Sequence, residues 1–491
     1  PIDLAGRAML PGFVDAHSHI TFALGMVGQA NVSSPPVGDV TDIPSLVAAL
    51  RELRDRRETP RGEWIIGWGY DPQQLAEQRH PTRLDLDPAF PDHPVMVVHV
   101  SGHGAVLNSR ALELAGIGRA TPTPPGGVIA RLDDGAQPAG LLMETAYAPV
   151  QALLPPPSND DRLAALDAAQ QMYAANGYTH AQDGHTTLAD AALLLQANRG
   201  GLLYLDIAAL PSFMSAREFL ADPSYRFGEY DGHLKFQGIK FVQDGSPQGR
   251  TAYMTAPYLG SGNGDAPGWR GEPIQPRERF VRQVRHVFDA GVQIFVHANG
   301  DAAIDDAIAA VRAAGVTARD DRRPVVVHSQ FQRPDHLSEY AALGMSSSYF
   351  TNHCYFWGDV HMANMGADRA AFISPLRAAR EHGITFSNHT DFNVTPLDPF
   401  FTLWTATNRQ SRSGATIGEA QAVDIYTALQ AITTGAAWQM FEERRKGAIR
   451  KGMLADFVIL DRDPLTGRAD DLRGLRVLET IKQGRTVYRA S

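Results

Sequence analysis

The stretch RERFVRQVRHVFDAGVQIFVHANGD, residues 277–301, joins a helical pattern to a short apolar run through one glycine. Apolar side chains recur at three- and four-residue intervals as far as Phe288, and Gly291 is the kind of residue that follows the end of a helix. The β-branched and aromatic run 292–296 is typical of a buried strand, and it is followed by His297. The stretch therefore predicts one helix–strand unit with an imidazole at the carboxyl end of the strand.

Units of the same kind follow one another from about residue 160 onward. Their apolar runs lie at 178–184, 202–210, 233–245, 292–301, 323–330, 345–353 and 384–391. Strands that alternate with helices are typical of a parallel sheet. Together with the run at 13–19 they make eight strands, which predict an α/β fold, a (β/α)8 TIM-type barrel. In such a barrel the catalytic groups lie at the carboxyl ends of the strands.

The segments that do not fit this alternation define the other domains. Residues 11–439 form the predicted barrel, and 21–157 separate its first strand from its second. The separating segment has a helical stretch and strand-like pieces of its own, so we expect an inserted subdomain near the barrel mouth. The chain termini, 1–10 and 440–491, predict a small β domain whose N-terminal part is incomplete, reduced to PIDLAGRAM.

Composition and charge indicate which kind of molecule the protein binds. Hydrophobic residues make up 44% of the 491 and charged residues 20%, as in a globular protein with a large core. The net charge of −9 comes without a long basic run, which disfavours nucleic acid and membrane surfaces as partners. No apolar run approaches the roughly 20 residues that span a bilayer. A small molecule is therefore the expected ligand, and a homodimer is the expected assembly.

Cys354 is the only cysteine, which excludes disulfides within the chain and thiolate-rich metal sites. Any metal ion must be held by His, Asp, Glu or a modified Lys. Cys354 itself is expected to be a packed thiol. The sequence begins without an initiator Met, so we expect an incomplete N-terminus; a removed leader stays open, and a cytoplasmic location is expected.

Metal-capable side chains collect at the predicted strand ends. His17 and His19 are two residues apart, so on a strand both imidazoles would face one side and could share an ion. The alternative is that one imidazole satisfies a hydrogen bond in the core while the other is solvated. Strand five supplies His297, and strand six supplies His328. Strand eight supplies His389 and Asp391, and strand four supplies Lys240. Taken alone, Lys240 is better explained as a buried stem with an ion-paired head.

Several longer motifs accompany these residues in a fixed order. They are LPGFVDAHSH (10–19), GWGYDP (67–72), HPTRLDLD (80–87), PDHPVMVVHVSGHGAVLNSRAL (91–112), GIKFVQDGSPQGRTAYMTAPY (238–258), HANGDAAID (297–305), VVHSQ (326–330), HTDFNVTPLDPF (389–400) and KGAIRKGMLADFVILDRDPL (446–465). With these motifs the chain resembles the amidohydrolase superfamily, specifically the amidohydrolase family 3 or YtcJ-like branch, which includes N-substituted formamide deformylases. The resemblance covers nearly the whole chain.

The resemblance implies a metal-dependent hydrolase that cleaves a non-peptide amide bond of a small, hydrophobic, N-substituted substrate. It also implies two divalent ions, expected to be zinc, held at the matching positions: His17, His19 and Asp391 at one ion, His297 and His328 at the other, and Lys240, carboxylated on its amine, between them. Two such ions lower the pKa of a shared water and polarise a carbonyl. Asp391 would be catalytic, a base toward that water and then an acid toward the leaving nitrogen.

Other residues are candidates for the substrate pocket. Where relatives often carry a Gly-Ser-Asp turn, this chain has Asn388 and His389 before Thr390, so His389 would be an extra site residue or a hydrogen-bond partner of a ligand. His103 in the insertion and His353 after strand seven are further candidates. The aromatic candidates are Trp68, Tyr70 and Trp357. Core packing is the commoner role of such rings, yet their number favours a bulky apolar or aryl group on the substrate.

Two other functions stay open. A deaminase with a single metal ion could use the same barrel without a modified lysine. A non-catalytic protein could use the barrel for assembly. The presence of every expected ligand type argues against the second, since a lost site has no physical reason to keep inward-facing imidazoles.

Overall fold

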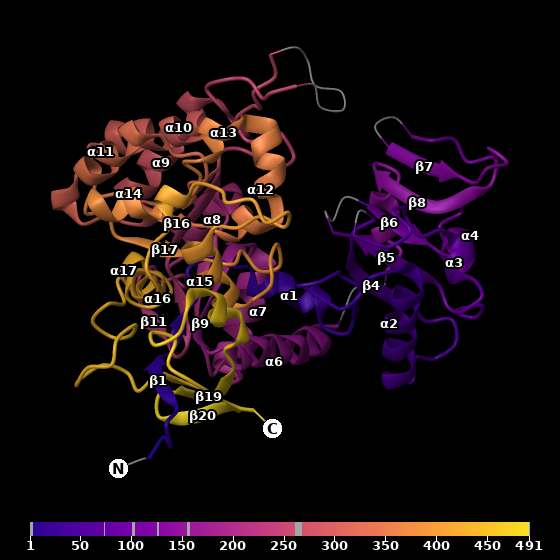
Figure 1. Cartoon of the computed structure of the whole chain (residues 1–491), viewed down its shortest axis with the longest axis horizontal. Helices are drawn as coiled ribbons and strands as arrows, with labels where there is room; N and C mark the ends of the chain where they lie inside the picture. The colour runs from indigo at the N-terminus through magenta and orange to yellow at the C-terminus, as the bar shows by residue number, and fades with distance from the viewer. Residues whose placement is uncertain are drawn as a thin grey trace. The chain divides into compact units, whose positions relative to one another are not determined.

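The computed structural model describes residues 3–72, 74–100, 104–124, 127–154, 158–260 and 268–490. The chain divides into two compact units (Figure 1), the larger from residues 1–23 and 166–491 and the smaller from 24–165. The sequence predicts an insertion at 21–157. The smaller unit ends later because helix α6 (Asn159–Ala175) runs across the boundary.

Two sheets of mainly parallel strands form the centre of the larger unit. The first has the order β11-β12-β10-β9-β2, with β2 (Phe13–Val14), β9 (Tyr178–Thr186), β10 (Asp206–Pro211), β11 (Tyr230–Asp231) and β12 (Leu234–Phe236). The second has the order β13-β14-β15-β16-β17, with β13 (Gly238–Val242), β14 (Gln293–Ala298), β15 (Val325–His328), β16 (Ser346–Tyr349) and β17 (Phe386–Asn388). The eight apolar runs of the sequence are therefore found as strands, in chain order across the two sheets.

The fourth expected strand is divided at Gln237. Its first part, β12, pairs with β10, and its second part, β13, pairs with β14. A parallel bridge between Ser212 and Lys240 also links β13 to the segment after β10. The division lets one stretch of chain belong to both sheets, and it brings Lys240 to their junction.

The expected barrel is found only in part, because the hydrogen-bonded ladder is open. Within the described ranges no strand pairing joins β17 to β2. The segments that follow these two strands are nevertheless adjacent: the amide of Asp391 donates to the carbonyl of His17 (3.2 Å), and the amide of His19 donates to that of Phe392 (2.8 Å).

Helices follow most of the parallel strands along the chain, as Figure 1 shows for the larger unit. They are α7 (Leu188–Arg199), η1 (Phe213–Ser215), α8 (Ala216–Ala221), α9 (Arg277–Asp289), α10 (Asp301–Ala313), η2 (Ala318–Asp320), α11 (Pro334–Leu343), α12 (Asn352–Met365), α13 (Ala367–Ala370), α14 (Leu376–Glu381), α15 (Pro399–Asn408), η3 (Glu419–Gln421), α16 (Ile425–Ala431), α17 (Thr434–Gln439) and η4 (Ala469–Gly474), with α1 (Ile20–Met26) after β2. None of the helices in the described residues is long and apolar enough to cross a membrane.

A cluster of buried apolar side chains lies among the parallel strands. Its members are Val14, Ala16, Ala208, Leu210, Phe295, Val325, Val327, Ala436, Ala437 and Met440. Side chains alternate along a strand, so Phe295 and His297 face the same side. The imidazole of His297 therefore follows the apolar cluster along that face. His328 directly follows Val327 and would face the opposite side of a regular strand. Its left-handed backbone, with φ of 71°, ends the alternation there.

The chain termini meet in a small antiparallel sheet of the larger unit, with the order β1-β18-β19-β20. Its strands are β1 (Ala8–Pro11), β18 (Phe457–Leu460), β19 (Val477–Lys482) and β20 (Arg485–Arg489). β1 is paired along its whole length with β18, from Ala8 opposite Leu460 to Pro11 opposite Phe457.

The smaller unit has a mixed six-stranded sheet of its own, in the order β3-β4-β5-β6-β8-β7. Its elements are β3 (Ala30–Asn31), α2 (Ile43–Arg56), β4 (Ile65–Tyr70), α3 (Arg83–Leu86), β5 (Val95–His99), β6 (Gly104–Leu107), α4 (Ser109–Leu114), β7 (Gly127–Arg131), β8 (Pro138–Glu144) and α5 (Ala148–Gln151). Helix α2 begins at Asp42, whose carboxylate accepts from the amide of Ser45 (2.7 Å), and it packs its apolar face on β4.

A buried ionic network ties the parallel strands to the terminal sheet. Asp206 on β10 accepts from the amines of Lys446 (2.5 Å) and Lys482 (2.6 Å), and Lys482 also donates to Asp456 (2.8 Å). All four side chains are buried. Loss of one partner would leave an unpaired buried charge, so we expect each to be costly to replace.

His180 on β9 lies opposite Asp206 in the strand register, and the surroundings of its ring shift its pKa. Neither ring nitrogen meets a hydrogen-bonding group of the described chain. Burial, reinforced by the charge of Lys446, holds the pKa of His180 well below its ordinary value. The folded protein therefore keeps this imidazole neutral where the unfolded chain takes up a proton.

We expect this neutral imidazole to make the free energy of unfolding fall by up to about 1.4 kcal/mol for each pH unit below about 6.5. His180→Gln should remove that share of the pH dependence, measured by urea unfolding at about pH 7.5 and about pH 5.5. His286→Gln, on the exposed face of α9, is the matched control. An unchanged pH dependence in His180→Gln would contradict the assignment.

Candidate metal centre

Nitrogen and oxygen donors from three segments converge at the carboxyl ends of the strands. One donor atom each from His17, His328 and Asp391 lies within 4.8 Å of the others, and all three residues are buried. The Asp391 carboxylate is 3.5 Å from Nε2 of His17, 3.3 Å from Nε2 of His19 and 3.9 Å from Nδ1 of His328. These contacts are longer than charge-assisted hydrogen bonds, and the donor set is one that divalent zinc prefers. The residues present therefore fit a divalent cation.

Lys240 on β13 faces the same cluster. Its Nζ is 2.8 Å from Nε2 of His17. Burial lowers the pKa of Lys240 to about 7, against the opposing effect of Asp391. An amine with that pKa is partly neutral at physiological pH, which an exposed lysine is not.

Gln182 on β9 fixes the orientation of the His17 ring. Its Oε1 is 2.7 Å from Nδ1 of His17, so Nδ1 carries the proton and Nε2 is left as an acceptor toward the amine of Lys240. Gly184 makes room for the ring, because a Cβ at that position would lie 2.3 Å from the imidazole. Any larger residue would have to displace the ring.

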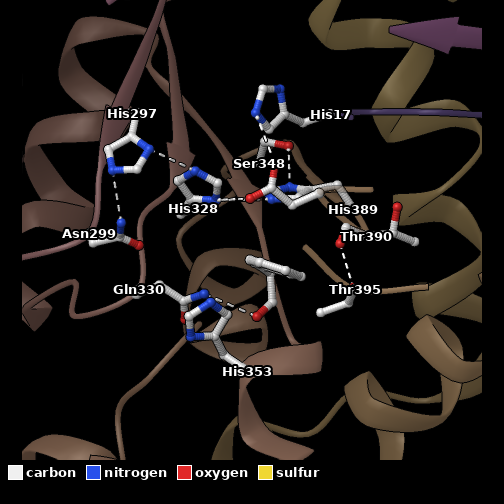
Figure 2. A network of polar contacts seen from close by, with 12 residues as sticks. His17, His297, Asn299, His328, Gln330, Ser348, His353, His389, Thr390 and Thr395 are labelled. Atoms are coloured by element: carbon white, nitrogen blue, oxygen red, sulfur yellow. Dashed lines mark hydrogen bonds and ion pairs between the residues drawn. The ribbon is translucent and has the colours of Figure 1, made fainter. Parts of the chain in front are cut away.

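His328 is the middle member of a row of three imidazoles, with His297 on one side and His389 on the other, as Figure 2 shows. Nδ1 of His297 is 3.0 Å from Nε2 of His328, and Nδ1 of His328 is 3.1 Å from Nε2 of His389. The row ends at Ser348, whose Oγ is 3.0 Å from Nδ1 of His389. Burial lowers the pKa of His297 to about 4 and that of His389 to about 3, so the row is neutral near pH 7.

The loops after β13 and β14 hold His297 from its other side. Its Nε2 is 3.0 Å from Nδ2 of Asn299 and 3.5 Å from Oδ1 of Asp244. Asp244 also accepts from the amides of Asn299 (2.9 Å) and Gly300 (2.7 Å) and so fixes the turn that follows β14. Such partners orient metal-binding imidazoles.

Left-handed backbone occurs at two of these residues. His328 has φ of 71° and Asp391 φ of 50°, and Ser329 after His328 has 46°. Residues with side chains rarely adopt this conformation, and it concentrates at functional sites where surrounding contacts enforce it. The turn at Asp391 is enforced in part by the hydrogen bond between its amide and the carbonyl of His17.

Of the remaining predicted residues, two lie on α12 and two on β4 of the smaller unit. His353 and Trp357 lie on α12, with ring centroids 4.5 Å apart, and Phe350 links His353 (4.6 Å) to His389 (4.9 Å) through ring contacts. Tyr70 is buried in the apolar core of the smaller unit. The rest are Trp68, which is half-buried on β4 of that unit, and His103, which lies outside the described residues.

Sequence reasoning missed the residues that orient the ligands. Gln182 and Asp244 belong to two copies of the tripeptide Gln-Asp-Gly, 182–184 and 243–245, each at the end of a parallel strand. This repetition is a signal that could have identified them. Ser348, in the run of serines on β16, gives no comparable signal.

A model of the amidohydrolase family matches residues 1–488. The chain belongs to this family, which confirms the resemblance in the sequence motifs.

Individual relatives are distant but cover the whole chain. YtcJ of Bacillus subtilis (strain 168), a protein assigned to the amidohydrolases, is 28% identical over 100% of this chain and 90% of its own length. The N-substituted formamide deformylase of Arthrobacter pascens is 26% identical over 98% of this chain and 89% of its own.

Solved structures share the fold. The crystal structure of an uncharacterized metal-dependent hydrolase from Pyrococcus horikoshii OT3 matches with a TM-score of 0.73 and 23% identity, over 96% of this chain and 89% of that chain. The crystal structure of an uncharacterized metal-dependent hydrolase from Pyrococcus furiosus matches with a TM-score of 0.73 and 24% identity, over 94% of this chain and 89% of that chain.

Proposed function

We propose that the protein hydrolyses a non-peptide amide bond of a small N-substituted substrate with the help of divalent metal ions. The observation that carries this proposal is the buried group of His17, His328 and Asp391, whose donor atoms lie within 4.8 Å of one another. Lys240, 2.8 Å from His17, adds an amine that can be modified. The likeness to a formamide deformylase supports an amide as the bond cleaved.

In this proposal His17, His19 and Asp391 would hold one ion, His297 and His328 would hold a second, and Lys240, as a carbamate, would supply oxygen ligands to both. Histidine and carboxylate ligands, with no thiolate among them, favour zinc. When bound, such ions supply hydroxide near neutral pH and polarise the carbonyl to be cleaved.

Asp391 moves the proton. Its carboxylate is 3.5 Å from His17 and 3.9 Å from His328, whose pKa values burial lowers, so both rings stay neutral and Asp391 is the charged base of the cluster. It accepts the proton of that water and then delivers it to the nitrogen that leaves. An amine leaves poorly unless it is protonated, so one carboxylate acts first as base and then as acid.

Exposed apolar side chains in the segments that follow β2, β10 and β17 support a hydrophobic substituent on the substrate. Phe22 on α1 is 53% exposed while its ring stacks on His19, with centroids 4.9 Å apart. Met214, after β10, is 77% exposed, and Val394, after β17, is 50% exposed. Apolar surface next to a polar centre is typical of a site that binds an apolar group.

Phe22→Ala is expected to reduce kcat/KM about tenfold for N-formylbenzylamine, because the aryl group loses roughly 1.4 kcal/mol of apolar contact. N-formylmethylamine, which has no group to place there, should lose less than about twofold. The ratio of the two values is the measurement. Tyr426→Ala, an exposed ring on α16, is the control. An equal loss for both substrates would show that Phe22 does not contact the substituent.

The proposed function is tested by metal analysis together with a screen of N-formyl and N-acyl aryl and alkyl amines. We expect close to two zinc ions per chain, turnover of at least one of these amides, and its loss with a strong chelator. Activity that survives without metal would overturn the proposal. Anomalous scattering from one ion beside an unmodified Lys240 would favour a deaminase instead.

A further inference from the structure

Helix α12 carries a pair of hydrogen-bonded imidazoles outside the metal cluster. Nδ1 of His353 is 3.1 Å from Nε2 of His361, and the two ring planes are within 3° of each other. The centroids are 5.3 Å apart, which fits rings joined edge to edge through these nitrogens. His353 is 4% exposed and His361 is fully buried.

One hydrogen bond leaves two arrangements of the protons. If His353 donates from Nδ1, then neutral His361 must carry its own proton on Nδ1. If His361 donates from Nε2, then its Nδ1 is a bare acceptor and His353 carries its proton on Nε2. The two arrangements therefore differ in whether the second proton is on Nδ1 of His361 or on Nε2 of His353.

The surroundings of His361 decide between them. Its Nδ1 is buried and meets no hydrogen-bonding group of the described chain. A buried N–H without a partner is rarer in folded proteins than an acceptor without one, and it costs about 1–3 kcal/mol. The arrangement with a bare acceptor at Nδ1 is therefore favoured. Burial lowers the pKa of His361 to about 3, so the pair holds no additional proton.

We propose that His361 is a positioning residue that holds His353 in its Nε2–H tautomer, and that this N–H donates to the carbonyl oxygen of the substrate. The assignment of the tautomer depends on the imidazole pair alone, whereas the contact with the substrate oxygen rests on the proposed function. Nε2 is on the side of the ring away from His361.

The position of His353 suits this contact. It follows β16 by four residues, at the carboxyl ends of the strands where the metal cluster lies. Phe350 bridges His353 to His389 through ring contacts, and Figure 2 shows His353 apart from the row of imidazoles. A neutral imidazole N–H stabilises negative charge on an oxygen without giving up its proton.

The tautomer can be read directly from the wild-type protein. In a long-range proton–nitrogen spectrum of ¹⁵N-histidine-labelled protein, we expect His353 to show a protonated Nε2 and a bare Nδ1. His353→Gln identifies its signals by their disappearance. A wild-type His353 protonated on Nδ1 would overturn the proposal, and this result needs no metal, substrate or activity.

Two replacements of similar size then test the catalytic consequence. His361→Gln keeps an N–H at the position of Nε2, and we expect kcat on N-formylbenzylamine within about threefold of wild type. His361→Leu removes the donor, and we expect kcat to fall about tenfold or more with KM little changed, because the misplaced tautomer weakens transition-state binding. A folded His361→Leu protein with wild-type kcat would overturn the role in catalysis. If wild-type protein cleaves none of the amides, the proposed function and the substrate contact both fail, while the spectrum still decides the tautomer.

Discussion

Asp391→Asn is expected to lower turnover by at least about 10²-fold, the usual effect of losing a group that acts as both general base and general acid. Asparagine keeps an oxygen near His17 and His19 but cannot accept the proton of the attacking water. Because substrate contacts are unchanged, KM should change little, and the loss should appear in kcat. Steady-state kinetics with zinc content measured on the same samples gives the comparison.

Asp289→Asn, an exposed substitution at the end of α9, is the control for this experiment and should behave as wild type. Near-normal turnover in a zinc-loaded Asp391→Asn protein would assign proton transfer to another group. His389 would then be the next candidate, since it is hydrogen-bonded to His328 in the same cluster.

Lys240→Ala is expected to lose metal and activity together. Nζ of Lys240 is 2.8 Å from His17 and lies near Asp391, in a place where a permanent ammonium would repel two bound cations. In the proposed function the neutral amine would instead attack carbon dioxide, forming a C–N bond and releasing one proton to solvent. The product would be a carbamate anion with two oxygen donors. Without it we expect each chain to bind less than one ion.

Rescue distinguishes this role from simple loss of structure. A short carboxylic acid added to Lys240→Ala should restore part of the metal content and part of the activity, whereas it should not change a Lys451→Ala control. Incubation of wild-type protein with ¹³C-bicarbonate should give a carbamate signal that is absent from the variant. Full metal content and activity with a bare amine at Lys240 would refute the carbamate.

Local sequence patterns predicted much of the fold. The helix–glycine–strand units gave the strands in their order, because periodicity and helix ends are set by neighbouring residues. The division of the fourth strand at Gln237 could not be predicted in this way, since it depends on β10 and β14, which pair with its two halves from opposite sides. The open ladder between β17 and β2 is likewise a property of segments far apart in the chain.

The candidate site likewise has parts that the sequence predicts and parts that it does not. His17, His297 and Asp391 could be proposed because strand ends and metal-capable residue types are visible in the sequence. Their orientation could not, because it is set by distant contacts, such as that of Gln182 with His17. The left-handed backbone at His328 is also invisible to patterns of alternation.

The terminal sheet has a consequence for synthesis on the ribosome. Ala8 pairs with Leu460, and Lys482 neutralises Asp206 on β10, so both β1 and β10 have partners that are translated hundreds of residues later. At ordinary rates of translation this delay is roughly tens of seconds. During that time the unpaired edge of β1 and the carboxylate of Asp206 have no native partner from the terminal sheet. The native pairing of β1 can therefore form only after residues 457–460 have been synthesised.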